Sequence, residues 1–177
     1  MITEINAARA HPDSYASLLE TWRPFYQGRR IVVPHDGIEE VELTEEGLAG
    51  LDEAIKVLRT THPLSTLLVS DALCRSARDL VETQGPTGQV GHIAPDGSDP
   101  MARARRYFPK PKLIGEAISY GREGGKDVIR HLLVDDGVKD RSHRKNLLDP
   151  RFRFVGVACG PHTVYGTMCV IDLGVQF

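Results

Sequence analysis

In the first half of the chain, apolar residues recur at the three- and four-residue spacing of helices with one buried face. This pattern predicts helices on both sides of His11-Pro12, where the proline breaks one helix and starts the next. It predicts further helices over residues 44–59 and, from a Ser70-Asp71 cap, to about Val81. A short helix is expected from Asp99-Pro100 to about Tyr107, and residues 84–98 are expected to be loop.

The period changes in the second half. Residues 113–120 alternate well enough for a strand or an extended loop, whereas residues 126–134 return to helical spacing. Residues 152–159 and 165–177 are β-rich runs, for which we predict a hairpin turning at Gly160-Pro161. Helices that come first and strands that come last predict an α+β domain with an antiparallel sheet.

A single domain, residues 1–177, accounts for the whole length. Residues 23–43 contain several turn-forming residues, and we expect them to form an irregular insertion in this domain. Loops carry variable function on a fixed scaffold, so this insertion is a natural place for a partner surface.

Charge and hydropathy exclude some classes of protein. A net charge of −2 gives no reason to expect nucleic acid or an anionic membrane as a partner. A local basic cluster is expected to be a solvated face; it comprises Arg103, Arg105, Arg106, Lys110 and Lys112. No run approaches the ~20 apolar residues of a transmembrane helix, and no basic-then-apolar leader starts at Met1.

The three cysteines do not form a recognisable disulfide or metal-binding framework. A Cys159–Cys169 bridge would require that two adjacent strands pair in the right register. We favour three buried apolar thiols, Cys74 included.

Three side chains carry the candidate chemistry. His92 lies in a glycine-rich loop, Glu116 lies in an apolar run where a charge must be paired, and His143 starts a helical turn that Ser142 could cap. Two neutral imidazoles with one or two carboxylates suit Zn²⁺ or another divalent metal with an open water position. Without metal, the same groups suit a general acid–base pair with Glu116 as candidate base, or a structural polar cluster. The motifs of common serine hydrolases, zinc peptidases and nucleotide-binding loops are absent from the sequence.

The order of Gly91-His92, Gly115-Glu116-Ala117-Ile118 and Ser142-His143-Arg144-Lys145-Asn146 resembles the CAP superfamily. This group includes cysteine-rich secretory proteins, antigen 5 allergens, pathogenesis-related proteins and bacterial SCP-like extracellular proteins. The resemblance covers nearly the whole chain except residues 23–43. It implies a three-layer αβα sandwich with a central antiparallel sheet, and an extracellular or periplasmic location.

Such relatives often line a central cavity with two histidines and two acidic residues. By resemblance, the candidate metal ligands here are His92, Glu116, His143 and a fourth acid, Asp135 or Asp136. The helical face of Val128 and Leu132 favours Asp135. The sequence departs from the family pattern in two places: Ala117 replaces the usual Asn, and His131 stands near a missing aromatic residue as a spare candidate.

The resemblance implies an exported binding domain. Its His/acid cleft would bind a divalent metal together with a small-molecule, lipid or protein ligand, and no catalysis is established for it. The alternative is a metal-dependent, peptidase-like hydrolase that uses the same cleft, with Glu116 or Asp135 as base. The sequence leaves open whether the protein is an enzyme.

Overall fold

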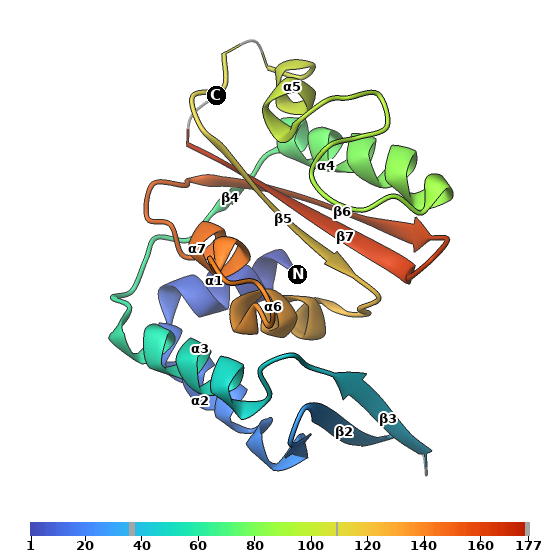
Figure 1. Cartoon of the computed structure of the whole chain (residues 1–177). Coiled ribbons are helices and arrows are strands. Elements are labelled where there is room, and N and C mark those ends of the chain that lie inside the picture. Colours follow the sequence, from blue (N-terminus) through green and yellow to red (C-terminus); the bar gives the residue numbers. More distant parts are fainter. Residues whose placement is uncertain (36–37, 109, 176–177) are drawn as a thin grey trace.

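The computed structural model describes residues 1–35, 38–108 and 110–175, and its core is a four-stranded sheet between two layers of helices (Figure 1). The strand order is β4 (Leu68–Val69), β6 (Phe154–His162), β7 (Gly166–Gly174) and β5 (Ile114–Tyr120). The three long strands are antiparallel, and the two-residue β4 pairs parallel to β6. The predicted α+β fold and three-layer arrangement are confirmed.

One face of the sheet is covered by α4 (Asp71–Gln84) and α5 (Pro100–Arg105). The helices α1 (Ile2–Ala10), α6 (Gly125–Val134) and α7 (Ser142–Leu147) lie next to the other face. The helices α2 (Pro12–Glu20) and α3 (Leu48–Thr60) pack on them, farther from the sheet. Short 3-10 turns occur at Arg23–Phe25 and Gly85–Thr87. None of the helices in the described part of the chain is both long enough and apolar enough to cross a membrane.

The helix α4 packs directly on β6. A Cβ atom added to Gly156 would clash with backbone atoms of Leu73 and Cys74, so this close approach requires glycine. The predicted caps of the helices on this face are present: the Ser70 hydroxyl accepts from the Leu73 N–H, and the Asp99 carboxylate accepts from the Ala102 N–H. Local sequence signals therefore set the starts of α4 and α5.

Three boundaries differ from the sequence prediction. Helix α3 begins at Leu48 rather than Thr44, because Gly47 precedes it with a φ of 59°. Helix α7 has Arg141 rather than Ser142 at its N-cap, with a left-handed backbone. The β6–β7 hairpin turns beyond His162 rather than at Gly160-Pro161, because the His162 ring accepts hydrogen bonds from the turn N–H groups of Val164 and Tyr165.

The prediction of an irregular segment at residues 23–43 is wrong. The segment forms a small antiparallel sheet of β1 (Tyr26–Gln27), β2 (Arg30–His35) and β3 (Ile38–Leu43), in that order. Its β-branched residues differ in burial: Ile31 on β2 is buried against the main core, whereas Val41 on β3 is 52% exposed. The turn-forming residues that suggested irregular structure lie partly between strands, with Gly28 at a φ of 64° joining β1 to β2.

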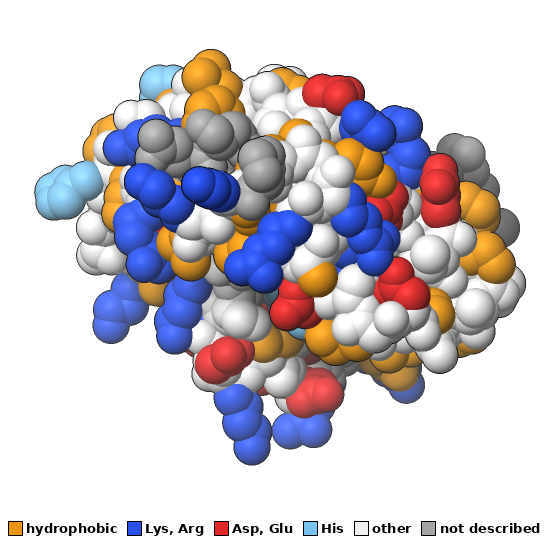
Figure 2. All heavy atoms as spheres, turned by 90° about the horizontal axis from the view of Figure 1, so that it is seen from above, with side chains coloured by type: hydrophobic (Ala, Val, Ile, Leu, Met, Phe, Trp, Pro, Cys, Tyr) orange, Lys and Arg blue, Asp and Glu red, His pale blue; other side chains and the backbone are white. Residues whose placement is uncertain are grey.

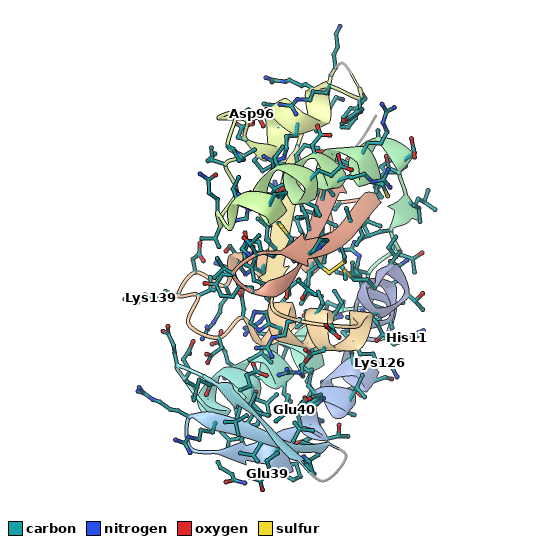
Figure 3. All side chains as sticks on the ribbon, turned by 90° about the vertical axis from the view of Figure 1, so that its right-hand side faces the viewer. His11, Glu39, Glu40, Asp96, Lys126 and Lys139 are labelled. Carbon is teal, nitrogen blue, oxygen red and sulfur yellow. A yellow bond between two sulfur atoms is a disulfide. The ribbon has the colours of Figure 1, made fainter. Side chains whose placement is uncertain are left out.

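The preference for three free thiols is also wrong. Cys159 and Cys169 are directly opposite each other in the β6–β7 ladder and form a disulfide, drawn as a yellow bond in Figure 3. The register of two strands that are adjacent in sequence brings the sulfur atoms together, and composition alone does not reveal that register. Cys74 is free, as expected, and partly buried.

Candidate functional site

Two histidines from distant parts of the chain, His92 and His143, have their rings close together. His92 lies in the loop between α4 and α5, and His143 lies in the first turn of α7. Their ring centroids are 6.3 Å apart and the ring planes are inclined by 42°. The structure therefore brings together the two imidazoles that the sequence singled out.

Glu116, on the edge strand β5 of the main sheet, binds the His92 ring. Its side chain is 1% exposed on β5, and Oε1 accepts a 2.7 Å hydrogen bond from the His92 Nδ1–H. Its other oxygen, Oε2, accepts from the Arg103 guanidinium at 2.6 Å. The apolar run around Glu116 thus predicts its burial and pairing correctly.

Arg103 is the site residue that the sequence interpretation missed. It was assigned to a solvated basic face, but its side chain is fully buried and also donates to the backbone oxygens of His92 and Ser98. Helical phase could have indicated its burial, because Arg103 is next to Ala104 on the buried side of α5, and Ala104 packs with Phe108 just beyond the helix. The remaining four residues of the cluster are exposed, and Figure 2, which looks down on this side of the molecule, shows basic side chains interspersed with acidic and apolar ones.

Asp135 holds His143 in the same manner. This residue ends α6 in a left-handed conformation, is 2% exposed, and its Oδ1 accepts from the His143 Nδ1–H at 2.7 Å. Its Oδ2 accepts from the Arg144 N–H at 3.1 Å. Asp136 points elsewhere, and its carboxylate accepts from the N–H groups of Glu45 and Glu46. Of the two alternatives, Asp135 is therefore the one that lies at the histidine pair.

These contacts determine which ring nitrogens are available. A carboxylate accepts only, so each Nδ1 carries the proton, and in the neutral ring Nε2 is then an acceptor. Within the part of the chain that the structure describes, neither Nε2 is hydrogen-bonded to a protein group. Each carboxylate contacts the Nδ1 atom of its histidine, so the Nε2 atom of each ring is left as a free acceptor among the described residues.

A cavity of about 430 Å³ lies beside the two histidines. It is lined by both rings together with Val90, Gly91, Ile118, Tyr120, His131 and Tyr165. Burial, and then the charge of Arg122, lower the pKa of His131 to about 4. The spare candidate His131 therefore stands at the cavity as a neutral ring at neutral pH.

Among residues 1–35, 38–108 and 110–175, no group of three or more His, Cys, Asp or Glu side chains is arranged to hold a metal ion. The four residues expected as ligands are instead two histidine–carboxylate pairs. Each acid lies at the Nδ1 side of its ring, in the position that supports a metal-ligating histidine in known metal sites.

A second buried acid lies next to Glu116. Asp172 on β7 is directly opposite Glu116 in the ladder and is fully buried. Burial, followed by the charge of Glu116, raises the pKa of Asp172 well above its ordinary value. The buried polar cluster under His92 therefore contains one acid that favours its neutral form.

The stability of the protein should depend on this proton. In the unfolded chain Asp172 ionises near pH 4, whereas in the folded chain it retains its proton to higher pH, so the free energy of unfolding falls as pH rises between the two pKa values. Replacing Asp172 by Asn removes this fall, and we expect Asp172→Asn to gain stability relative to wild type as pH rises above about 4. Urea unfolding at a series of pH values measures this difference, with exposed Asp140→Asn as control. A wild-type-minus-variant difference that is constant with pH contradicts the expectation.

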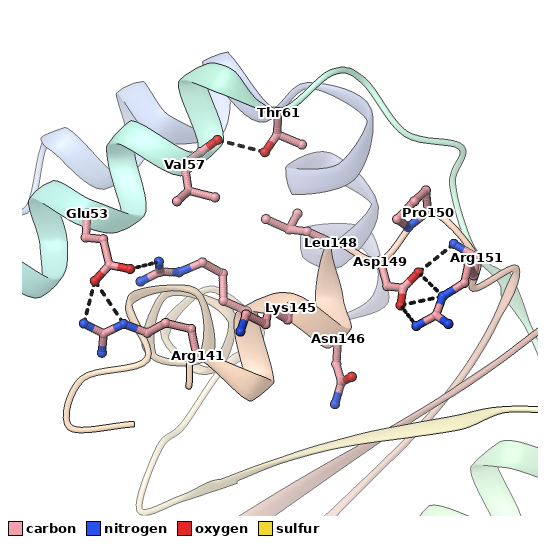
Figure 4. Close-up of a pocket in the computed structure, with 11 residues that line it drawn as sticks. Glu53, Val57, Thr61, Arg141, Lys145, Asn146, Leu148, Asp149, Pro150 and Arg151 are labelled. Atoms are coloured by element: carbon pink, nitrogen blue, oxygen red, sulfur yellow. Dashed lines mark hydrogen bonds and ion pairs between the residues drawn. The ribbon is translucent and has the colours of Figure 1, made fainter. Parts of the chain in front are cut away.

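A larger cavity lies on the other side of α7. It has a volume of about 660 Å³ and lies between α3 and residues 141–151. Figure 4 shows Glu53 paired with Arg141 and Asp149 paired with Arg151. Glu53 also pairs with Arg144. Arg144 also donates to the backbone oxygens of Leu133 and Val134, so its contacts hold α7 and the end of α6 against α3.

His162, the last residue of β6, is buried. Its ring packs against Tyr120 and Tyr165, at centroid distances of 5.2 and 5.3 Å, and these two tyrosines line the cavity beside the histidine pair. His162 thus supports the aromatic wall of the cavity.

Known proteins resemble this chain in sequence and in fold. The model of the CAP family, described as the cysteine-rich secretory protein family, matches residues 53–172. The uncharacterised protein YkwD of Bacillus subtilis strain 168 is 26% identical over 99 residues, which is 56% of this chain and 37% of that protein. The chain thus aligns with well under half of this curated relative.

Two solved structures share the fold. An outer surface protein from Borrelia burgdorferi superposes with a TM-score of 0.56 and 22% identity, covering 64% of this chain and 80% of that one. An extracellular protein containing an SCP domain from Bacillus anthracis superposes with a TM-score of 0.54 and 20% identity, covering 73% and 41%. The family match spans about two thirds of the residues and includes both histidines, so the chain belongs to the CAP, or cysteine-rich secretory protein, family.

Proposed function

We propose that this CAP domain binds a divalent metal ion of the zinc type through the Nε2 atoms of His92 and His143, and that the adjacent cavity receives a ligand. One observation carries the proposal: each histidine donates its Nδ1–H to a buried carboxylate, Glu116 or Asp135. Carboxylates in this position fix the tautomer of a metal-ligating histidine and increase the basicity of its other nitrogen.

The donor set suits such an ion. Neutral imidazole nitrogens bind zinc at about 2.0–2.1 Å, and two rings with centroids 6.3 Å apart are close enough to share one ion. Two protein ligands leave coordination positions open, so a bound ion would supply a Lewis acid to which water or a ligand atom can attach.

The cavity indicates the kind of ligand. Val90, Ile118 and the two tyrosines make most of its wall apolar and aromatic, whereas its polar atoms converge at the histidine pair. A small molecule, or the side chain or tail of a larger partner, fits this pattern if it has an apolar body and one electron-donating atom for the ion.

The alternative of a peptidase-like hydrolase has less support. It needs a base whose carboxylate faces the cavity, but Glu116 already binds His92 and Arg103 with its two oxygens and is 1% exposed. The Asp135 oxygens are engaged by the His143 ring and the Arg144 N–H. This geometry favours a binding role over base catalysis by either acid.

An extracellular or periplasmic location agrees with the disulfide. Disulfides form and persist in oxidising compartments and are rare in the cytosol. The solved neighbours are an outer surface protein and an extracellular protein, which also supports placing this domain outside the cytoplasm.

Calorimetric titration of chelator-treated protein with zinc chloride tests the site. We expect about one ion per chain in the wild type, a loss of more than about 100-fold in affinity for His92→Ala or His143→Ala, and a loss of about 10–100-fold for Glu116→Gln, which removes the charge that supports His92. The matched control is His62→Ala, an exposed histidine far from the pair in sequence, which should leave the affinity unchanged. Equal zinc affinity in wild type and the double variant His92→Ala/His143→Ala would falsify the proposed site.

A further inference from the structure

The six-residue β3 is an edge strand of the small sheet built by residues 23–43. The strand order is β1-β2-β3, so β3 pairs only with β2 in the described part of the chain. Figure 1 shows this hairpin at the end of the molecule opposite α4 and α5. We propose that the free edge of β3 binds an extended polypeptide segment in which basic and apolar residues alternate, a function separate from the metal site.

The hydrogen-bond register identifies the backbone groups that are available. The Thr44 N–H donates to the Arg29 oxygen at 2.9 Å, and hydrogen-bonded pairs alternate along an antiparallel ladder. The next hydrogen-bonded pair along the ladder, two residues away on each strand, is therefore Ile31 with Glu42. It follows that the N–H and C=O groups of Val41 and Leu43 point away from β2, toward the free edge.

A groove runs beside this edge. It has a volume of about 760 Å³ and is lined by residues 40–43 of β3, by Ile31 and Val33 of β2 and, across from them, by residues 120–123. Ile31 and Val33 pair with Glu42 and Glu40, so the groove lies against this face of the hairpin. Val41 and Leu43, which belong to the other face of β3, also line it, so the groove extends around the free edge. The groove thus has access to the backbone groups that a docking strand needs.

The charges around the groove favour a basic partner. Glu42 is bound by Arg122 at 2.6 Å and by Arg130 at 2.8 Å, which ties β3 to the main domain. Asp127 also pairs with both arginines, so the two acids together balance their charge. Glu40 and Glu123 also line the groove, are exposed, and have no ion-pair partner among the residues that the structure describes. Figure 3 shows Glu40 on this hairpin, together with its neighbour Glu39.

The face of β3 that carries Val41 and Leu43 favours a partner strand with apolar residues at every second position. Val41 and Leu43 are 52% and 76% exposed there, whereas Glu40 and Glu42 take the other face. A strand docked on β3 would then place valine-like residues beside Val41 and Leu43 and lysine-like residues beside the glutamates.

A second copy of this chain is a poor occupant of the same edge. Three of the six residues of β3 are glutamates, namely Glu39, Glu40 and Glu42. Like charges opposite each other destabilise a pair of strands, so two β3 strands would repel each other. A basic segment would instead be attracted to these glutamates.

The groove adjoins the cavity of the histidine pair. Tyr120 and Tyr165 line both spaces, so an extended segment on β3 would be directed toward His92 and His143. Binding at β3 does not need a metal, and its test below is independent of the zinc titration.

The probe is a capped, fluorescently labelled heptapeptide of alternating lysine and valine, and the control peptide alternates glutamate and valine. Fluorescence anisotropy with wild-type protein should show binding of the lysine peptide that weakens as salt is raised, and no binding of the glutamate peptide. No measurable binding of the lysine peptide, or equal binding of both, overturns the proposal.

The informative variant is Val41→Pro. It removes the N–H that points to the free edge and leaves the bonds to β2 intact, and proline is tolerated at strand edges. We expect the lysine peptide to bind about tenfold or more weakly, whereas Val41→Thr, which keeps the N–H, should bind within about twofold of wild type. Circular dichroism establishes that both variants are folded, and equal affinity of Val41→Pro and wild type overturns the proposal.

Peptide N-methylation gives a second measurement on the unmodified protein. Methyl groups on one alternate set of peptide amides should abolish binding, and methyl groups on the other set should not, because only one set faces β3 in an antiparallel or parallel ladder. Equal effects of the two sets overturn docking at the edge. Sedimentation of wild-type protein tests whether a second copy of the chain binds this edge. A wild-type dimer that the substitution Val41→Pro dissociates would show that β3 pairs with a second copy, which overturns the proposal.

Discussion

Replacing Arg103 by methionine is expected to destabilise the protein by about 3–5 kcal/mol, because it leaves the Glu116 carboxylate buried without its cationic partner. Both side chains of this ion pair are at most 1% exposed, and their N–O distance is 2.6 Å. Methionine fills much of the volume of the arginine stem, so the loss reports the charge and hydrogen bonds rather than a large cavity. Urea unfolding followed by circular dichroism measures the change.

Two further variants separate the ion pair from general effects. Arg105→Met alters an exposed residue of the same helix and should change the free energy of unfolding by no more than about 0.5 kcal/mol. Arg103→Met/Glu116→Gln removes both charges and should recover part of the loss, since the uncompensated charge is then gone. If Arg103→Met costs less than about 1 kcal/mol, Glu116 does not depend on this arginine, and the role assigned to Arg103 is wrong.

The same contact links the core to the histidine pair. Arg103 donates to Glu116 and to the backbone oxygen of His92, so it fixes both the carboxylate that supports the ring and the loop that carries it. Arg103 is therefore a positioning residue for His92, and a folded Arg103 variant should also bind zinc more weakly.

Periodicity predicted most of the regular structure. The helices that became α1, α2, α4 and α6 and the strands of the β6–β7 hairpin follow from residues whose local preference and burial agree. The small sheet was missed because its strands are short and bracketed by glycine and proline, which are also the residues of irregular loops. The disulfide was missed because it depends on strand register.

The site could be predicted only in part. A glutamate in an apolar run must be paired, which indicated the burial of Glu116, but its partner Arg103 looked like one member of a basic surface cluster. The proximity of His92 and His143 depends on how a loop and a short helix meet at the sheet, which no local pattern encodes. The choice between Asp135 and Asp136 is decided by the left-handed end of α6, where one residue faces His143 and the next faces Glu45.

Replacing Arg9 by methionine should have a comparable effect, although Arg9 lies outside residues 53–172, the part of the chain matched by the family model. Its side chain is fully buried and donates to four backbone oxygens, at distances from 2.8 to 3.3 Å. The acceptors are Ser65, Leu147, Asp149 and Phe152. A buried carbonyl left without a partner costs about 1–3 kcal/mol, so we expect a total loss on the order of 3–5 kcal/mol.

The consequence for function follows from where those carbonyls lie. Leu147 ends α7, and Asp149 and Phe152 belong to the segment that joins α7 to β6, so Arg9 secures the helix that carries His143. The matched control is Arg59→Met, a half-exposed arginine that pairs with Glu20 and should change stability by no more than about 1 kcal/mol. Urea unfolding gives the stability, and zinc titration of folded Arg9→Met protein tests whether α7 has shifted. A variant with wild-type stability would mean that the segment after α7 holds its conformation without Arg9, and the role assigned to this arginine would be wrong.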